Sequence, residues 1–273
     1  MRIRVRHATT YDYELLASGV IQALRVTPRS HEGQRVLSWR VDVDVDGLLR
    51  PTRDAFGNAL HLFYAEGPIN RITVRVTGEA ELRETAGVVR GAPEPFAPGV
   101  FQRSTPLTQA DPALVAWARE TATPANDPLA ALHALMADLK ARLRFDVLAT
   151  GVETTAAQAF AAGHGVCQDY AHIFLAGARS LGVPARYVSG HLCRRDSAEQ
   201  PAAHAWAEAF VPDLGWTGFD PANGVCPDQS YLRVATGLDY LDAAPLRGAR
   251  RGGGQERLRV AVTARDAERQ RQD

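Results

Sequence analysis

The chain has little of several features that mark particular classes of protein. Only 3 cysteines occur among its 273 residues, and their wide spacing fits reduced thiols better than a disulfide framework. Basic and acidic residues number 31 each, so no net charge favours a nucleic-acid or anionic-membrane partner. No run reaches the roughly 18 apolar residues that a membrane span needs. We therefore predict a protein that binds neither nucleic acid nor membrane.

The first ten residues also lack the apolar centre of a secretory signal peptide. The run MRIRVRHATT alternates polar and apolar side chains, as a strand does. A cytoplasmic location is therefore the expectation. A chain of this length with 45% hydrophobic residues can bury one large core or two smaller ones, and we expect two domains. The sequence carries no indication of oligomeric state.

One cysteine lies where the sequence predicts the start of a helix. Gly163 and Gly165 in GHGVCQDY permit a tight turn, and a helix is expected over residues 166–181, where Gly182 suits a left-handed cap. Cys167 is then in the first turn, where free backbone N–H groups and the helix dipole favour thiolate over thiol. A lone cysteine in this position is more often a small buried core residue. The residues downstream favour a nucleophile instead.

A β-hairpin is predicted downstream by HAWAEAF and WTGFDPANG. His204 opens the first strand, whose alanines line the opposite face, and Asp220 ends the second strand, after a turn that contains Asp213. Facing residues of an antiparallel pair have numbers with a constant sum. The numbers of His204 and Asp220 add up to 424, which is even. If facing residues of the hairpin have numbers with an even sum near 424, both side chains lie on one face, and if that sum is odd, they lie on opposite faces.

These side chains together supply the parts of a nucleophilic site. An imidazole can take the thiol proton and return it to a leaving amine, while a carboxylate fixes the tautomer and orientation of the imidazole. Cys167, His204 and Asp220 are the predicted nucleophile, base and orienting residue, and the backbone N–H of Cys167 is the predicted oxyanion donor. Taken singly, a hydrogen-bonded strand histidine and a turn aspartate before proline are the commoner explanations. The combination favours catalysis.

Other polar and aromatic residues near these motifs have structural interpretations. His172 lies five residues after Cys167, about 140° round the helix, so we expect a buried hydrogen-bonding role. Asp169 in the first turn complements the helix dipole and is expected to pair with an arginine. Trp206 and Trp216 fit a cleft wall and a core position equally well.

No metal or cofactor is predicted. The run DVDVDG at residues 42–47 resembles the front of a calcium loop, but its twelfth position is Arg53, a cation where a bidentate glutamate is needed. The alternating valines of this run instead indicate a strand with one face exposed to solvent.

The pattern of elements predicts an α+β fold. Residues 1–85 contain several alternating, β-branched runs typical of an antiparallel sheet. Two helices are predicted farther along, each with an aspartate N-cap followed by proline, at Asp111 and Asp127. Several helices followed by antiparallel strands are typical of α+β proteins.

Five stretches resemble the prokaryotic transglutaminase-like family with its amino-terminal β-rich domain: GVCQDYAHIFLAGARSLGVPARYVSGHL, HAWAEAFVPDLGWTGFDPANG, RIRVRHATTYDY, RVTPRS and DAFGN. The resemblance implies a papain-like core, as in the transglutaminase and cysteine peptidase superfamily, and a Cys/His/Asp triad that falls on Cys167, His204 and Asp220. It divides the chain into an amino-terminal β-rich domain (1–88), a linker or strap (89–106), a catalytic core (107–264) and a flexible tail (265–273).

The resemblance implies a thiol enzyme that acts on peptide or isopeptide amide bonds through an acyl-enzyme, by hydrolysis or by transfer to an amine. Its expected partner is a peptide or protein amide substrate. A narrow small-molecule amidase and a binding or assembly module with an idle triad are the alternatives. Gln168 follows the nucleophile where animal cross-linking enzymes carry tryptophan, so their calcium dependence and glutamine specificity do not carry over. Ala161 stands where papain-like peptidases place an oxyanion-hole glutamine.

Overall fold

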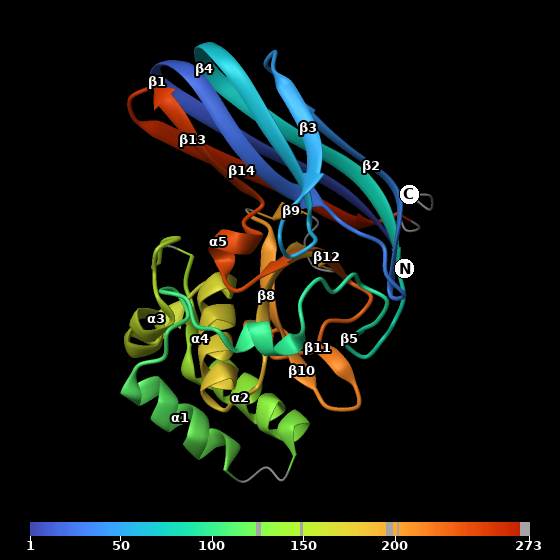
Figure 1. Ribbon diagram of the computed structural model, residues 1–273, viewed down its shortest axis with the longest axis vertical. Coiled ribbons are helices and arrows are strands. Elements are labelled where there is room, and N and C mark those ends of the chain that lie inside the picture. The colour runs from blue at the N-terminus through green and yellow to red at the C-terminus, as the bar shows by residue number, and fades with distance from the viewer. Residues whose placement is uncertain (124–126, 148–149, 195–198, 201, 268–273) are drawn as a thin grey trace.

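A computed structural model describes residues 1–123, 127–147, 150–194, 199–200 and 202–267. It has two parts, a long twisted antiparallel sheet and a second, smaller sheet packed against helices (Figure 1). The α+β class predicted from the sequence is confirmed. No helix in the described part of the chain has the length and apolar character to cross a membrane.

The long sheet is built mainly from the first third of the chain. Its strands are β1 (Arg2–Thr27), β2 (Gln34–Val43), β3 (Leu48–Arg53) and β4 (Ala59–Leu82), joined by β9 (Glu199–Gln200), β13 (Leu246–Gly252) and β14 (Glu256–Asp266). The strand order is β2-β4-β1-β14-β9, with β13 also on β1 and β3 on β4. Alternate side chains of β1, such as Ile3 and Val5, are fully buried, as the period of two in the sequence predicts.

Both ends of the chain meet in this sheet. β14 pairs antiparallel with β1, from Ile3 opposite Asp266 to Tyr13 opposite Glu256, and β13 pairs with the second half of β1. In Figure 1 the red strands lie beside the blue one. The sequence suggests residues 107–264 as one domain, whereas in the structure the strands after Pro245 hydrogen-bond to the amino-terminal sheet.

The second sheet has the strand order β12-β8-β10-β11-β5, and all its pairs are antiparallel. Its strands are β5 (Val88–Val89), β8 (Ala185–Leu192), β10 (His204–Val211), β11 (Gly215–Phe219) and β12 (Tyr231–Gly237). The helices are α1 (Pro112–Ala122), α2 (Pro128–Arg142), α3 (Ala156–Ala162), α4 (Cys167–Ser180) and the short α5 (Tyr240–Ala243). A two-stranded parallel pair, β6 (Arg144–Phe145) with β7 (His164–Gly165), precedes α4.

The predicted helix starts are confirmed. The Asp111 side chain accepts a hydrogen bond from the backbone N–H of Leu114 at 2.8 Å, and Asp127 accepts one from Ala130 at 2.9 Å. A proline occupies the first turn of each helix, where its missing N–H costs nothing. These caps satisfy donors that the helices cannot satisfy internally.

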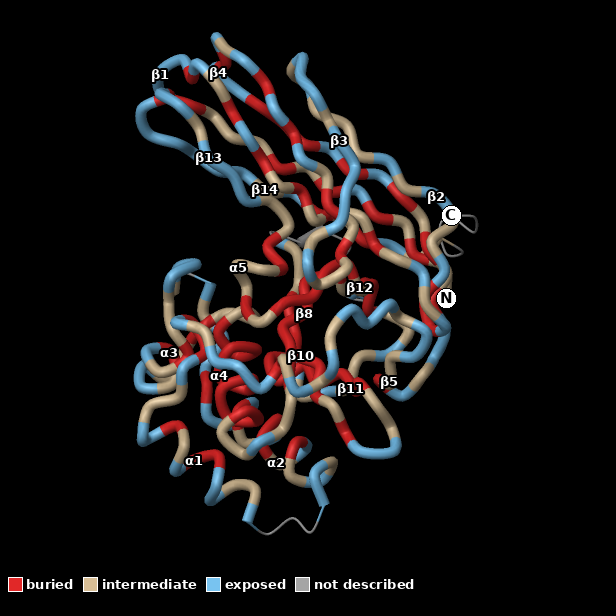
Figure 2. The backbone as a smooth tube through the Cα atoms, in the orientation of Figure 1, coloured by how far each residue is buried: buried red, intermediate tan, exposed pale blue. Residues whose placement is uncertain are grey.

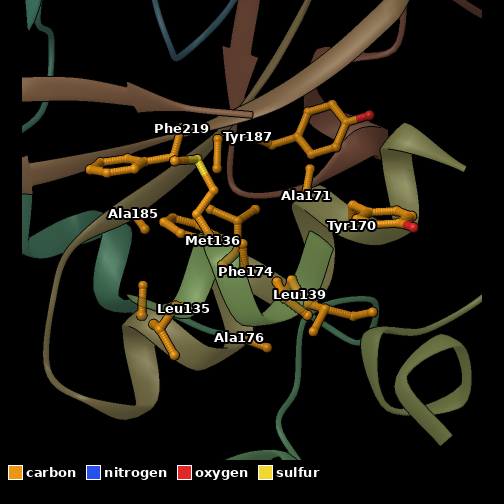
Figure 3. Close-up of a cluster of buried hydrophobic side chains, with 14 of the residues drawn as sticks. Leu135, Met136, Leu139, Tyr170, Ala171, Phe174, Ala176, Ala185, Tyr187 and Phe219 are labelled. Carbon is orange, nitrogen blue, oxygen red and sulfur yellow. The ribbon is translucent and has the colours of Figure 1, made fainter. Parts of the chain in front are cut away.

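The core of the half that carries the predicted triad, between residues 107 and 245, lies between α4 and the second sheet. The alanine face of β10, formed by Ala205, Ala207 and Ala209, is buried in the same cluster as most of α4. Small side chains there let the helix approach the sheet closely. Phe174 of α4 stacks on Phe219 of β11 with ring centroids 5.2 Å apart (Figure 3). In Figure 2 α4 and the central strands form the most continuous buried region.

Residues 89–106, which the sequence predicts to be a linker or strap, pack on the other face of this sheet at Arg186 and Trp216. The structure shows a packed strap. It includes a 3-10 turn, Pro98–Gln102, with a buried Phe101. Glu94 binds the guanidinium of Arg186 in two hydrogen bonds of 2.5 and 3.0 Å, and that guanidinium lies 3.9 Å above the Trp216 ring.

A buried ion network continues from this strap. Glu208 of β10 accepts hydrogen bonds from Arg186 and Arg233 at 2.7 Å each. Burial alone would raise the pKa of Glu208, but the charges and hydrogen bonds of Arg233 and Arg186 outweigh it and lower the pKa to about 2. The charges of the two arginines balance those of Glu208 and Glu94. Removal of one partner would therefore leave a buried charge unpaired, which is strongly destabilising.

Buried histidines should make the fold sensitive to acid. Burial lowers the pKa of His172 and of His191 to about 3, helped by Arg179 in the first case and by His7 in the second. Both rings stay neutral in the folded protein, while in the unfolded chain they bind protons below about pH 6.5. Their contribution to stability is therefore complete above about pH 6.5 and is lost as the pH falls from there toward 3.

We expect unfolding in urea to show a loss of about 2 kcal/mol per histidine between pH 6.5 and 5.0, since each unit of pH costs about 1.4 kcal/mol. The free energy of unfolding of His191→Gln should fall less over the same pH range, by about that amount. This holds whatever the stability of the variant at pH 7.5. An identical slope in parent and variant would mean that His191 titrates normally in the fold.

Candidate active site

The nucleophile candidate lies at the turn that starts α4. Gly163 ends α3 in the left-handed conformation, with φ of +70°, which favours glycine. At Gly165 a Cβ atom would lie only 2.6 Å from the Asp169 carboxylate, so no other residue fits without rearrangement. Val166 is the N-cap, and Cys167 is the first residue of the helix, as the sequence predicts. Its backbone N–H thus belongs to the helix start, where donors lack partners within the helix.

Asp169 holds this turn in place. One carboxylate oxygen accepts hydrogen bonds from the Val166 N–H at 2.8 Å and from the Thr150 hydroxyl at 2.6 Å. Burial raises the pKa of Asp169, against these hydrogen bonds, which lower it. The structural role predicted for Asp169 is confirmed, and its partners among the described residues are Thr150 and Val166, where an arginine was expected. His172 accepts a hydrogen bond from the backbone N–H of Tyr240 at 3.1 Å and is fully buried, as expected.

The hairpin brings the histidine and the carboxylate together. β10 and β11 pair with Ala207 opposite Phe219, a sum of 207 + 219 = 426, which is one of the even registers. His204 and Asp220 are therefore diagonal neighbours on one face. The Nε2 atom of His204 lies 2.6 Å from Oδ2 of Asp220. Nδ1 is then the ring nitrogen left for the Cys167 thiol, whose interaction with His204 helps to raise the pKa of the imidazole.

The surroundings of His204 raise the pKa of its imidazole. Burial lowers its pKa, but hydrogen bonds with Asp220 and Cys167, together with the charges of both groups, outweigh burial and raise the pKa to about 10. The side chain is 11% exposed, so one part of the ring reaches the surface. A protonated imidazole beside the thiol at neutral pH is the arrangement that stabilises a thiolate.

The carboxylate of Asp220 is fully buried and receives several donors. Oδ2 accepts from His204, from the Tyr231 hydroxyl at 2.8 Å and from the Asn223 side chain at 2.7 Å, and Oδ1 accepts from the Asn223 N–H at 3.1 Å. Burial raises the pKa of Asp220, but the hydrogen bonds, led by that of His204, lower it below its usual range. The carboxylate is thus held charged and in one orientation.

Two of these contacts were missed from the sequence. Asn223 follows Asp220 by three residues in FDPANG, so its backbone contact is an Asx-turn signal that the sequence contains. Tyr231 comes from β12, on the far side of β8 from the hairpin, and no local pattern indicates that it reaches Asp220.

An aromatic wall supports the imidazole. Trp206 stacks against His204 with ring centroids 6.1 Å apart at 29°, and Tyr231 meets Trp206 edge-on at 5.4 Å. Trp206 is only 2% exposed, so it backs the site from within the core. Trp216 instead lies under Arg186 and beside Phe101, at the strap.

Comparison with known proteins places the chain in a family. The profile described as the transglutaminase-like superfamily matches residues 115–221, and that of the bacterial transglutaminase-like N-terminal region matches residues 3–81. An uncharacterized protein of Mycobacterium leprae is 30% identical over 280 residues, which cover 96% of this chain and 97% of the relative. The chain belongs to the transglutaminase-like superfamily, in the bacterial group that carries this N-terminal region.

Two further relatives are informative in different ways. A protein-glutamine gamma-glutamyltransferase of Pseudomonas aeruginosa is 32% identical, but the match covers only 38% of this chain and 17% of that protein. The crystal structure of a Cytophaga hutchinsonii protein, provisionally assigned as a cysteine protease, superposes with a TM-score of 0.78 over 98% of this chain and 91% of that one, at 20% identity. That likeness establishes the shared fold, which is the fold of transglutaminase-like thiol enzymes.

Thiol labelling should distinguish the three cysteines. At neutral pH we expect iodoacetamide to label Cys167 well before the others, because it alone lies at a helix start beside a protonated imidazole. Cys193 is 6% exposed, and burial raises the pKa of Cys226. Mass spectrometry of peptides from a labelling time course would measure the order. Equal rates at all three thiols would contradict an activated Cys167.

Proposed function

We propose that the protein is a thiol enzyme that cleaves peptide or isopeptide amide bonds through an acyl-enzyme on Cys167, with water or an amine as the acceptor. The observation that carries the proposal is the 2.6 Å hydrogen bond between His204 and Asp220, with Cys167 at the start of α4 among the groups that raise the pKa of His204. Three residues from separate elements converge there in the order that nucleophile, base and orienting group require.

The reaction would begin with attack of the Cys167 sulfur on the amide carbonyl carbon. Charge then develops on the carbonyl oxygen, and the Cys167 backbone N–H at the helix start is a donor suited to it. Collapse of the tetrahedral species breaks the C–N bond, and the proton on Nδ1 of His204 passes to the departing amine. The products of this half-reaction are a free amine and a thioester on Cys167.

The second half-reaction reverses the roles. Neutral His204 takes a proton from water or an incoming amine, which attacks the thioester and releases the thiolate. Asp220 keeps its charge throughout and stabilises the imidazolium each time it forms. Because Tyr231 and Asn223 also donate to Asp220, the carboxylate cannot rotate away from His204 without losing further hydrogen bonds.

A panel of amide substrates would test this function. Peptides with side-chain and main-chain amides are incubated with the protein, and ammonia release, new amino termini and incorporation of a labelled amine are measured together. Hydrolysis gives the first two signals, and transfer gives the third. Turnover confined to small amide metabolites would indicate the narrow amidase. Absence of turnover by protein whose Cys167 is alkylated readily would contradict the proposal and favour a binding module.

A further inference from the structure

Exposed apolar side chains in the catalytic half gather around the predicted nucleophile. Among the residues between 107 and 245 that the structure describes, the large apolar side chains that are exposed are Phe145, Val147, Val152 and Val225, with exposed fractions of 51%, 62%, 54% and 45%. Single exposed apolar residues are common on any protein surface. Here, however, all of them lie on segments next to Cys167 or Asp220, and such clustering marks a recognition surface.

Phe145 and Val147 lie beside the turn that leads to Cys167. β6, which ends at Phe145, runs parallel to β7. The backbone N–H of Asp146, between the two apolar residues, donates to the carbonyl of Gly165 at 3.0 Å. Gly165 is two residues before the nucleophile, so this hydrogen bond fixes the distance between the apolar pair and the start of α4.

Val152 is fixed to the same helix start from another direction. Its backbone carbonyl accepts a hydrogen bond from the side chain of Gln168, the residue after the nucleophile, at 3.3 Å. Thr150, two residues earlier, donates to Asp169. Hydrogen bonds of Asp146, Thr150 and Val152 therefore connect the described residues around these apolar side chains to residues on both sides of Cys167.

Two charged residues of this segment pair with each other, and a third, Glu153 next to Val152, is exposed. Arg144 and Asp146, which alternate with the apolar residues, form an ion pair with each other at 3.1 Å. Across the triad, Val225 is joined to Asp220 by a pair of backbone hydrogen bonds of 2.9 and 3.2 Å. Segments that carry exposed apolar side chains are thus hydrogen-bonded to residues next to the nucleophile and to the backbone of Asp220.

We propose that Phe145, Val147 and Val152 form an apolar strip that binds the side chains next to the scissile amide. The proposal rests on the amide-cleaving function and adds its substrate class, which is peptides with leucine-like or aromatic residues beside the bond. Binding would remove apolar surface of both partners from water, so a substrate with such residues gains over one with serine or glycine. A hydrophobic contact of this size typically changes kcat/KM by about 10- to 200-fold.

The test uses two kinds of probe on the full-length protein. The first is a pair of peptide amides that differ only in leucine or serine beside the scissile bond. The second is a matching pair of peptidyl chloromethyl ketones, which alkylate the thiol without amide turnover. The parent is expected to favour leucine at least about tenfold in kcat/KM and in the alkylation rate.

The variant Val147→Thr/Val152→Thr keeps the side-chain shapes but adds hydroxyl groups. It should lose most of the leucine preference, while iodoacetamide, which needs no binding surface, should label Cys167 at the parent rate. Leu48→Thr is the matched control, because Leu48 is 48% exposed on the amino-terminal sheet, and it should keep the preference.

The outcomes separate the two proposals. A leucine preference in alkylation, lost in the variant, supports the strip even if no amide is turned over, which would contradict the proposed function alone. Turnover without a leucine preference, or a preference that the variant keeps, would overturn the strip and leave the amide-cleaving function standing.

Discussion

Cys167→Ala is expected to abolish amide turnover, with a fall in kcat of at least about 10⁴-fold, because the proposed acyl-enzyme forms on the sulfur that this change removes. Stability should change little. The side chain is small and only partly buried at the start of α4, so its loss removes few contacts, and the melting temperature should stay within a few degrees.

Cys226→Ala is the control, since Cys226 lies outside the triad and should leave kcat within about twofold of the parent value. Steady-state kinetics and thermal unfolding of the three proteins would be measured side by side. Residual turnover above a few per cent in Cys167→Ala, or unfolding of that variant together with an inactive parent, would assign Cys167 a structural role.

Asp220→Asn is expected to lower kcat by about 10- to 10³-fold. The change keeps the shape but removes the charge that stabilises the imidazolium, and it can favour the wrong tautomer of His204. The loss should be smaller than in a serine triad, because a thiolate and an imidazolium can form before substrate arrives. The hydrogen bonds of Asp220 in the structure should lower kcat of the variant further. Both carboxylate oxygens of Asp220 accept hydrogen bonds, so either orientation of the new amide turns its NH₂ group toward a donor.

Asp213→Asn provides the matched control. Asp213 lies in the hairpin turn with φ of +66°, a conformation that asparagine adopts as readily as aspartate, so kcat should change less than about twofold. The kinetic comparison should be made at saturating substrate and at several pH values. An unchanged kcat in Asp220→Asn would remove Asp220 from the mechanism and leave a Cys167–His204 pair.

Much of the site could be predicted from the sequence, because it depends on residues that are close together in the chain. Glycines at 163 and 165 predicted the turn before α4, and aspartate and proline predicted two helix starts. Residue parity showed that any even register of the hairpin would bring His204 and Asp220 together, and the structure has such a register. Each of these depends on residues close in the chain. The catalytic roles of Cys167, His204 and Asp220 stay a prediction until they are tested.

Contacts between strands that are far apart in the sequence could not be predicted. Periodicity tells which side chains share a face, but not which strand lies next to which. The approach of Tyr231 to Asp220 requires the order β12-β8-β10-β11, and the pairing of Glu94 with Arg186 requires the strap to cross that sheet. The edge-on contact of Tyr231 with Trp206 depends on the same strand order.

The pairing of β13 and β14 with β1 has a consequence for synthesis of the chain on the ribosome. β1 is among the first segments made, yet one of its edges finds its partners only after Leu246 has emerged. The helices and the second sheet are complete in sequence before then, so that half can fold while β1 still has an open edge. Open strand edges recruit other chains. A nascent or truncated chain that stops before Leu246 should therefore be the aggregation-prone form of this protein.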